Sequence, residues 1–157
     1  MSDVQVMAGS DQIVVDEVFP HPAEVVWKTL TTPELIGRWL RMPATGFEAI
    51  KGNRFTYQTS PAGEWDGVIQ CEVLEAAQNR RLVYSWRGGH DGNTGYGSRL
   101  DTLVTWTLEP ASGGTRVRLV HSGFARPRND NAFRTMSDGW PKVFQRIDAI
   151  AAEDEKE

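Results

Sequence analysis

The chain has 157 residues, 39% of them hydrophobic, and a formal net charge of −4 from 17 Lys and Arg against 21 Asp and Glu. A chain of this length builds one hydrophobic core, so we expect a single domain over residues 1–157. The chain has one cysteine, Cys71, which excludes an internal disulfide and a multi-cysteine metal site. An acidic chain whose arginines are spaced along strand-like segments is not typical of nucleic-acid-binding proteins.

The first part of the chain predicts one strand and two short helices. A polar stretch over about residues 1–10 is expected to be flexible, and the β-branched run at 12–19 (QIVVDEVF) predicts a strand closed by a proline. Apolar residues at helical spacing then predict a helix after Pro22 and a second helix that begins at Pro33. The second helix lacks the basic and polar side chains that a DNA-reading helix needs, so we interpret the pair as a packing element.

From residue 44 to residue 124 the hydrophobic period changes to two, and glycine, proline and asparagine turns interrupt it. This pattern predicts six strands at approximately residues 46–50, 54–58, 65–76, 81–86, 99–109 and 115–124. The connections are too short for crossover helices, so neighbouring strands must pair antiparallel. With the first strand they predict a curved sheet of about seven strands.

The alternation also predicts that one face of this sheet is apolar and aromatic, and a C-terminal helix is expected to cover it. The apolar residues of that helix recur at the spacing of one helical face: Trp140, Val143, Phe144, Ile147, Ile150 and Ala151. Pro141 either starts this helix or kinks it. The charged residues 153–157 are expected to form a flexible tail.

The element order and several strings of residues resemble the helix-grip fold of the START-like (SRPBCC) superfamily. Within it they resemble the branch named for the activator of heat-shock-protein ATPase homologue, over roughly residues 12–152. The strings are FPHPAEVVWKTLTTPEL at 19–35, Trp39, GNRF at 52–55, WDG at 65–67, RLVYSW at 81–86, VTWTL at 104–108, GTR at 114–116, LVHSGF at 119–124 and Gly139-Trp140. The resemblance implies an α+β fold in which a curved antiparallel sheet wraps a long C-terminal helix, with two short helices after the first strand.

The resemblance further implies a cavity between the sheet and the C-terminal helix, suited to a hydrophobic or amphiphilic small molecule. Aromatic side chains in the inward phase of the strands predict the same wall, and we expect a pocket of roughly 300 Å³ or more. Each of these rings can alternatively serve only to fill the core. The candidate ligand-binding residues are Trp39, Phe55, Tyr57, Ile69, Cys71, Tyr84, Trp86, Val104, Trp106, Leu119, His121, Trp140 and Phe144.

No recognisable catalytic motif occurs in the sequence. The histidines His21, His90 and His121 lie in three different settings without metal-ligand spacing, so we expect neither a metal nor a cofactor. The glycine-rich tract 88–97 predicts a mobile hairpin loop near the mouth of the cavity. Cys71 lies between apolar neighbours and is expected to behave as a small inert hydrophobe.

His121 is the most informative titratable residue, because the alternation places it on the inward face of its strand. Three roles remain open for it: a hydrogen-bonded structural residue, a ligand contact, or a general base. The structural role is the most common one for a histidine within a core.

Three functions follow as alternatives. The first is binding or sequestration of a small hydrophobic or aromatic ligand. The second is a polyketide cyclase- or hydrolase-like enzyme in which His121 with Tyr57 or Tyr84 transfers protons. The third is a module that stimulates a chaperone ATPase. We favour the first, and expect a monomer or homodimer without nucleic-acid or membrane partners. The third is disfavoured because the chain lacks the extra N-terminal domain that the resemblance implies for eukaryotic co-chaperones. A cytoplasmic location is expected, because neither a leader peptide nor a run of about 18 apolar residues occurs.

Overall fold

The computed structural model describes residues 3–6 and 12–155, and it confirms the α+β helix-grip architecture. The elements in chain order are β1 (Asp3–Val6), β2 (Gln12–Phe19), α1 (Ala23–Thr31), α2 (Pro33–Leu40), β3 (Ala44–Thr45), β4 (Arg54–Gln58), β5 (Val68–Ala77), β6 (Arg81–Gly88), β7 (Leu100–Ala111), β8 (Gly114–Ser122) and α3 (Asp130–Glu155).

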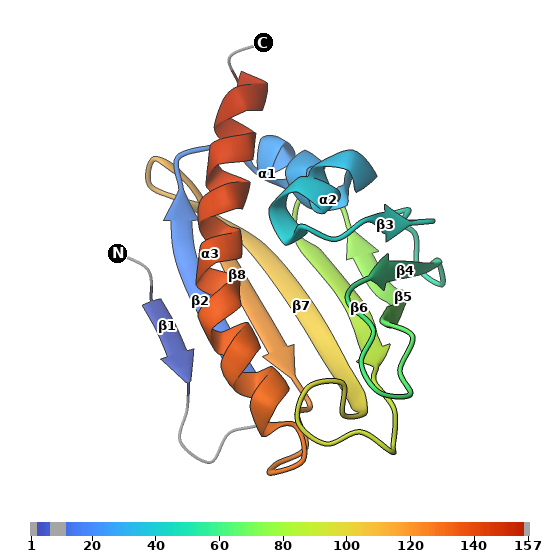
Figure 1. Cartoon of the computed structure of the whole chain (residues 1–157). Coiled ribbons are helices and arrows are strands. Elements are labelled where there is room, and N and C mark those ends of the chain that lie inside the picture. The colour runs from blue at the N-terminus through green and yellow to red at the C-terminus, as the bar shows by residue number, and fades with distance from the viewer. Residues whose placement is uncertain (1–2, 7–11, 156–157) are drawn as a thin grey trace.

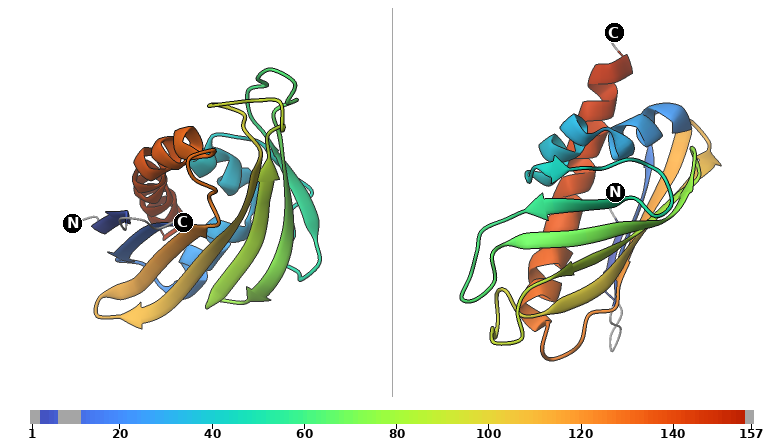
Figure 2. Two further views of the ribbon diagram at one scale, coloured as in Figure 1. Left: turned by 90° about the horizontal axis from the view of Figure 1, so that it is seen from below. Right: turned by 90° about the vertical axis from the view of Figure 1, so that its right-hand side faces the viewer.

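The strands form one antiparallel sheet in the order β1-β2-β8-β7-β6-β5-β4-β3. The strands from β3 to β8 follow one another along the chain, as expected for a meander, while β2 returns to pair with β8. The sheet curls around α3, and α1 and α2 cover one end of the same concave face (Figures 1 and 2). This wrapping places the long helix against the inward side chains of the central strands.

The period-two pattern correctly predicted which side chains enter the core. Phe55 lies opposite Cys71 and Tyr57 opposite Ile69 across β4 and β5, and all four are buried. The same holds for the inward residues of β6, β7 and β8: Leu82, Tyr84, Trp86, Leu100, Val104, Trp106, Val117, Leu119 and His121 are buried. Burial of one face fixes the register, because a slip of one residue would turn every inward side chain outward.

Helix α3 covers this face, but it is longer than the sequence predicted. It begins at Asp130, so Pro141 lies inside the helix and does not start it. Helical residues reach Glu155 where a tail from residue 153 was expected, and Glu153 and Asp154 make ion pairs to Arg38 of α2 (2.8 Å) and Lys28 of α1 (2.6 Å). These contacts fix the C-terminal turns of α3 against the two short helices.

The strand boundaries differ from the prediction in three places. The structure adds β1 at the sheet edge, within the stretch of about residues 1–10 that was expected to be flexible; residues 1–2 and 7–10 of that stretch lie outside the described residues. The predicted strand at 46–50 is absent there, since β3 comprises only Ala44–Thr45. Trp65 precedes β5 in a loop instead of opening the strand, which begins at Val68.

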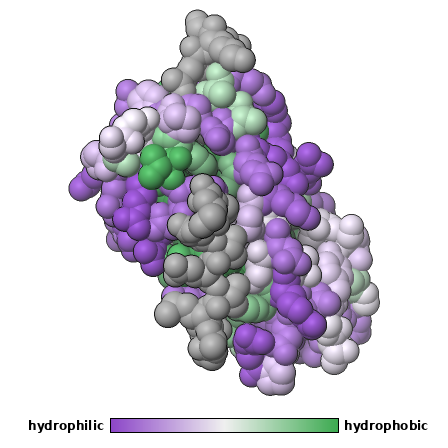
Figure 3. Space-filling model, turned by 90° about the vertical axis from the view of Figure 1, so that its left-hand side faces the viewer, coloured by the Kyte–Doolittle hydropathy of each residue, from purple (hydrophilic) through white to green (hydrophobic). Residues whose placement is uncertain are grey.

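The outer surface on the β1 side of the molecule is mostly hydrophilic where it is coloured (Figure 3). This view shows no broad apolar face comparable with the buried face of the sheet. Among the described residues, no helix is long and apolar enough to cross a membrane.

Candidate functional site

The centre of the space between sheet and helix is filled by interlocking aromatic rings. Trp106 contacts Trp39, Trp140 and Phe144 with ring centroids 5.6–5.8 Å apart. A second cluster joins Phe55 to Tyr57 and to Tyr84, each at 5.4 Å. These separations are typical of packed aromatic pairs, so the large central cavity that the sequence predicted is occupied by the protein's own side chains.

An apolar pocket does exist, but toward the end of α3 at which the helix begins. Its volume is about 180 Å³, smaller than the roughly 300 Å³ expected. The lining comes from the loops after α2, β4 and β6, from the strand ends and from the first turns of α3. The lining residues are Met42, Thr59, Trp65, Ile69, Trp86, Gly88, Gly89, Tyr96, Gly97, Ser98, Leu100, Asn131, Ala132, Thr135 and Met136.

Of the candidate ligand-binding residues, Ile69 and Trp86 line this pocket. The others are buried in the core, where the rings of Trp39, Phe55, Tyr57, Tyr84, Trp106, Trp140 and Phe144 pack with Cys71, Val104, Leu119 and His121. Most of the candidate ligand-binding residues therefore lie in the packed core and not in the wall of the pocket.

Two loops close the pocket and are tied to each other. Asn93 Nδ2 donates to the carbonyl of Ala62 (2.7 Å), and the Tyr96 hydroxyl donates to the carbonyl of Ser60 (2.9 Å). The rings of Trp65 and Tyr96 lie 6.0 Å apart. The glycine-rich tract thus lies at the mouth of the pocket, as expected, and is held to the β4–β5 loop by side-chain hydrogen bonds.

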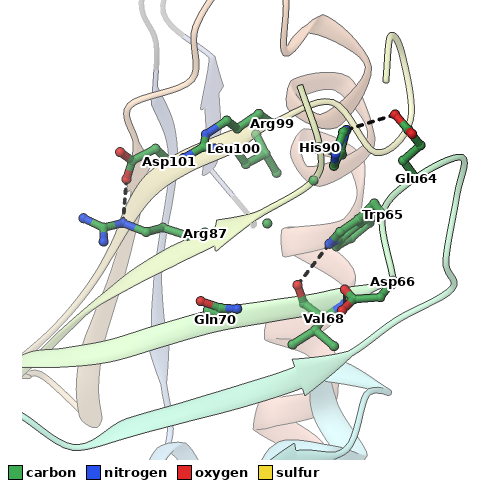
Figure 4. A pocket seen from close by; sticks show the side chains of 12 residues that line it. Glu64, Trp65, Asp66, Val68, Gln70, Arg87, His90, Arg99, Leu100 and Asp101 are labelled. Atoms are coloured by element: carbon green, nitrogen blue, oxygen red, sulfur yellow. Dashed lines mark hydrogen bonds and ion pairs between the residues drawn. The ribbon is translucent and has the colours of Figure 1, made fainter. Parts of the chain in front are cut away.

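A polar groove of about 600 Å³ lies on the other side of the same wall (Figure 4). Trp65, Gly88, Gly89 and Leu100 line both the groove and the apolar pocket. The wall is thin because two of its residues carry no side chain: a Cβ on Gly88 would lie 3.1 Å from Trp65 Cζ2. The Trp65 indole, held by its Nε1–H donating to the carbonyl of Val68 at 3.1 Å, therefore separates the two spaces.

Both arginines of the groove lie beside carboxylates. Arg87 Nε donates to Asp101 at 2.9 Å (Figure 4), and Arg99 lies 3.6 Å from Asp91, outside the lining. His90 Nδ1 accepts from the backbone N–H of Gly92 at 2.9 Å and lies 3.5 Å from the carboxylate of Glu64. The groove therefore presents both signs of charge and favours neither an anion nor a cation.

His121 is held in a buried chain of hydrogen bonds that fixes its tautomer. Trp140 Nε1–H donates to His121 Nδ1 (3.1 Å), so the ring proton must be on Nε2, which donates to Thr102 Oγ1 (2.8 Å). The Thr102 hydroxyl in turn donates to the carbonyl of Trp86 (2.8 Å). Burial lowers the pKa of His121 from 6.5 to about 3. Both ring nitrogens are engaged, so of the three roles considered the geometry supports the structural one.

The two tyrosines and the cysteine near His121 are equally unsuited to proton transfer near neutral pH. Burial raises the pKa of Tyr57, Tyr84 and Cys71 well above their ordinary values. The Tyr84 hydroxyl also accepts a hydrogen bond from Trp106 Nε1 at 3.2 Å. The thiol of Cys71 stays protonated and packs as a small apolar group. No cluster of potential metal ligands occurs within residues 3–6 and 12–155.

The pocket residues that the sequence analysis missed lie on loops and on the first turns of α3. Trp65 was assigned to a strand, and Met42, Tyr96 and Met136 were not assigned to the site. A signal for Met136 was present, because Phe133, Met136 and Trp140 have helical spacing.

Comparisons with known proteins agree with this fold. Residues 20–152 match the family model described as Activator of Hsp90 ATPase homolog 1-like protein. A solved structure of protein MLL2253 from Mesorhizobium loti is 34% identical, covers 90% of this chain and 97% of its own, and superposes with a TM-score of 0.78. The mouse protein Activator of 90 kDa heat shock protein ATPase homolog 2 is 26% identical over 115 residues, which is 73% of this chain but only 31% of that relative's length. DynU16, a protein in the dynemicin biosynthetic locus, shares the fold at 21% identity and a TM-score of 0.68, over 88% of this chain and 46% of its own.

Proposed function

The chain belongs to the family of Activator of Hsp90 ATPase homolog 1-like proteins, and on that premise we propose that it binds a small hydrophobic molecule in the pocket between the sheet and the first turns of α3. The observation that carries this proposal is the pocket itself, which holds about 180 Å³ behind walls that include Met42, Ile69, Leu100 and Met136. Apolar walls around a preformed space are typical of small-molecule sites.

The volume limits the size of the ligand. An apolar cavity of about 150 Å³ accommodates benzene. A pocket of about 180 Å³ therefore suits one aromatic ring with a short substituent, or an aliphatic molecule of similar size. A larger ligand requires the two tied loops to separate, or the Trp65 indole to move toward the polar groove.

The test is a titration of the protein with α-methylstyrene, a one-ring apolar probe, followed by two-dimensional NMR of the backbone amides. We expect saturable shifts confined to residues around the pocket. Ala132 lines the pocket from α3, so Ala132→Phe should fill the space and weaken binding at least about tenfold. Ala149→Phe on the exposed side of the same helix is the matched control and should bind like the wild type. If the wild type does not bind, or if Ala132→Phe binds equally well, the proposal is wrong.

The enzyme alternative needs a proton-transfer group beside the ligand. His121, Tyr57 and Tyr84, which the sequence offered for this role, are buried in the packed core, where the ring nitrogens of His121 and the hydroxyl of Tyr84 make hydrogen bonds. The geometry does not support a cyclase-like mechanism through these residues.

Activation of a chaperone ATPase is a second candidate, favoured by the match to the mouse relative of that name. The match covers 31% of that relative, so the similarity alone does not assign the activity of the whole relative to this chain. The experiment is to add the purified chain to a 90 kDa heat shock protein and measure ATP hydrolysis. A rate unchanged at saturating concentrations of the chain would dismiss this candidate.

A further inference from the structure

The wall between the apolar pocket and the polar groove contains two side chains, those of Trp65 and Leu100. The other residues that line both spaces are Gly88 and Gly89. Leu100 is buried on β7, where it pairs with Gly88 of β6. Trp65 lies in the loop before β5 and is only half-buried. Of the two side chains, that of Trp65 can therefore be changed with less effect on the sheet.

The end of β6 leaves room for the indole of Trp65 at Gly88. The φ of Gly88 does not lie in the left-handed region, so its backbone conformation does not require glycine. A Cβ at this position would lie 3.1 Å from Trp65 Cζ2, and its next contacts, at 3.6 Å, are ordinary ones. Glycine in a strand often marks a place where another group approaches closely. Here that group is the Trp65 ring, which closes the wall.

Trp65 is held in this position at its backbone and at its ring. Its N–H and carbonyl pair with the carbonyl and N–H of Ala62 at 2.9 and 3.1 Å. Its Nε1–H donates to the carbonyl of Val68 at 3.1 Å (Figure 4), and its ring lies 6.0 Å from that of Tyr96. A molecule that extends past the wall would have to break the hydrogen bond to Val68 and displace the ring.

The spaces on the two sides of the indole differ in polarity. The pocket is lined mainly by apolar side chains, such as those of Met42, Ile69 and Met136. The groove presents Gln70 and charged side chains of both signs. A molecule that spans both spaces would therefore need an apolar end and an uncharged polar end, because a charged end would also meet groups of its own sign.

We propose that Trp65 determines the size of the ligand: it restricts the protein to molecules of about one ring and excludes elongated amphiphiles whose polar end would reach the groove. This rests on the proposed function, because it concerns the molecule bound in the same pocket. Without the indole, pocket and groove form one site that is apolar inside and polar outside. Trp65 thus acts on the choice of ligand and not on whether the pocket binds one.

The experiment compares α-methylstyrene with phenylhexanol, in which the phenyl ring carries a hexyl chain with a terminal hydroxyl. Wild type should prefer α-methylstyrene. In Trp65→Ala the ratio of the two dissociation constants should shift toward phenylhexanol at least about tenfold, because each additional buried methylene contributes about fourfold in affinity. In this variant phenylhexanol should also shift the backbone amide resonances of Gln70 and Asp101, which line the groove but not the pocket.

Met136→Ala is the matched control, since Met136 lines the pocket but not the groove. It enlarges the pocket without opening the wall, so phenylhexanol should leave the Gln70 and Asp101 resonances in place. Trp65→Leu keeps an apolar side chain in the loop and should shift the ratio in the same direction even if Trp65→Ala does not fold.

The outcomes separate this inference from the proposed function. If α-methylstyrene binds wild type but the Trp65 variants keep the wild-type ratio, the inference is overturned and the proposed function stands. The same holds if the ratio shifts while the groove resonances stay in place. If α-methylstyrene does not bind wild type, both fail.

Discussion

Acidification should destabilise this protein through His121, and the substitution His121→Gln should remove that sensitivity. Glutamine keeps a carbonyl that can accept from Trp140 Nε1–H and an amide that can donate to Thr102 Oγ1, but it does not take up a proton. The side chains in ring contact with His121 are those of Trp86, Phe124 and Trp140, which are uncharged. A proton on the imidazole would therefore be buried without a countercharge.

The magnitude follows from the two pKa values. Burial lowers the pKa of His121 to about 3 in the folded protein, from 6.5 for an unperturbed histidine. Between these values the unfolded chain binds a proton that the folded protein does not, so stability is present above pH 6.5 and is lost as the pH falls toward 3. Well inside this window each pH unit costs about 1.4 kcal/mol, and the cost is smaller near pH 6.5, where the unfolded histidine is only half protonated, so lowering the pH from 6.5 to 4.5 should cost about 2 kcal/mol.

The assay is urea unfolding followed by tryptophan fluorescence at several pH values, with wild type and His121→Gln in parallel. From pH 6.5 to 4.5 the unfolding free energy of the wild type should fall by about 2 kcal/mol more than that of His121→Gln. Other groups, such as Asp16, whose pKa is lowered by its hydrogen bond from Arg116, contribute equally to both proteins and cancel. A difference that does not change with pH would refute the assignment of His121 as a buried neutral residue.

Four further substitutions concern stability and can be checked by urea unfolding at neutral pH. Phe144→Ala should cost about 3–5 kcal/mol, because Phe144 is fully buried and stacks on Trp106 at 5.6 Å; a cost under 1 kcal/mol would mean that this layer is not tightly packed. Gly95→Ala should cost about 1–2 kcal/mol, since Gly95 has φ +68° but open space around it. Gly89→Ala at φ +80° should cost about 1–3 kcal/mol more, because its Cβ would lie 2.1 Å from the carbonyl oxygen of Ser98; equal costs would contradict that close approach. Pro141→Ala should stabilise by about 1–3 kcal/mol, because it restores an N–H inside α3, and any destabilisation would argue against a continuous helix.

The sheet could be predicted from the sequence because its pattern is regular and long. The strands β4, β5, β7 and β8 bury mainly one face, so apolar residues recur at every second position and fix both the strand and its inward phase. The helix face from Trp140 onward carried an equally clear signal. The first turns of α3 did not, because residues 130–139 are mostly polar and include Gly139.

The pocket was harder to predict, because its volume depends on how closely α3 approaches the sheet. The alternation identifies which rings face inward, but it does not say whether facing rings interlock, as Trp106 and Phe144 do, or leave a space between them. The pocket is also closed by loops, whose contacts such as Asn93 to Ala62 join residues that no local pattern connects. The cytoplasmic location, the oligomeric state and the absence of nucleic-acid partners stay predictions.

The hydrogen-bonded chain from Trp140 through His121 and Thr102 to Trp86 links α3 to β8, β7 and β6 in turn. Hydrophobic burial has no direction, so an apolar helix on an apolar sheet can rotate or slide between placements of similar free energy. Directional bonds at one point along the helix single out one of these placements. The polar residues within this aromatic core therefore determine where α3 packs on the sheet more than they stabilise that packing. They also keep the first turns of α3 at the position where these turns line the pocket.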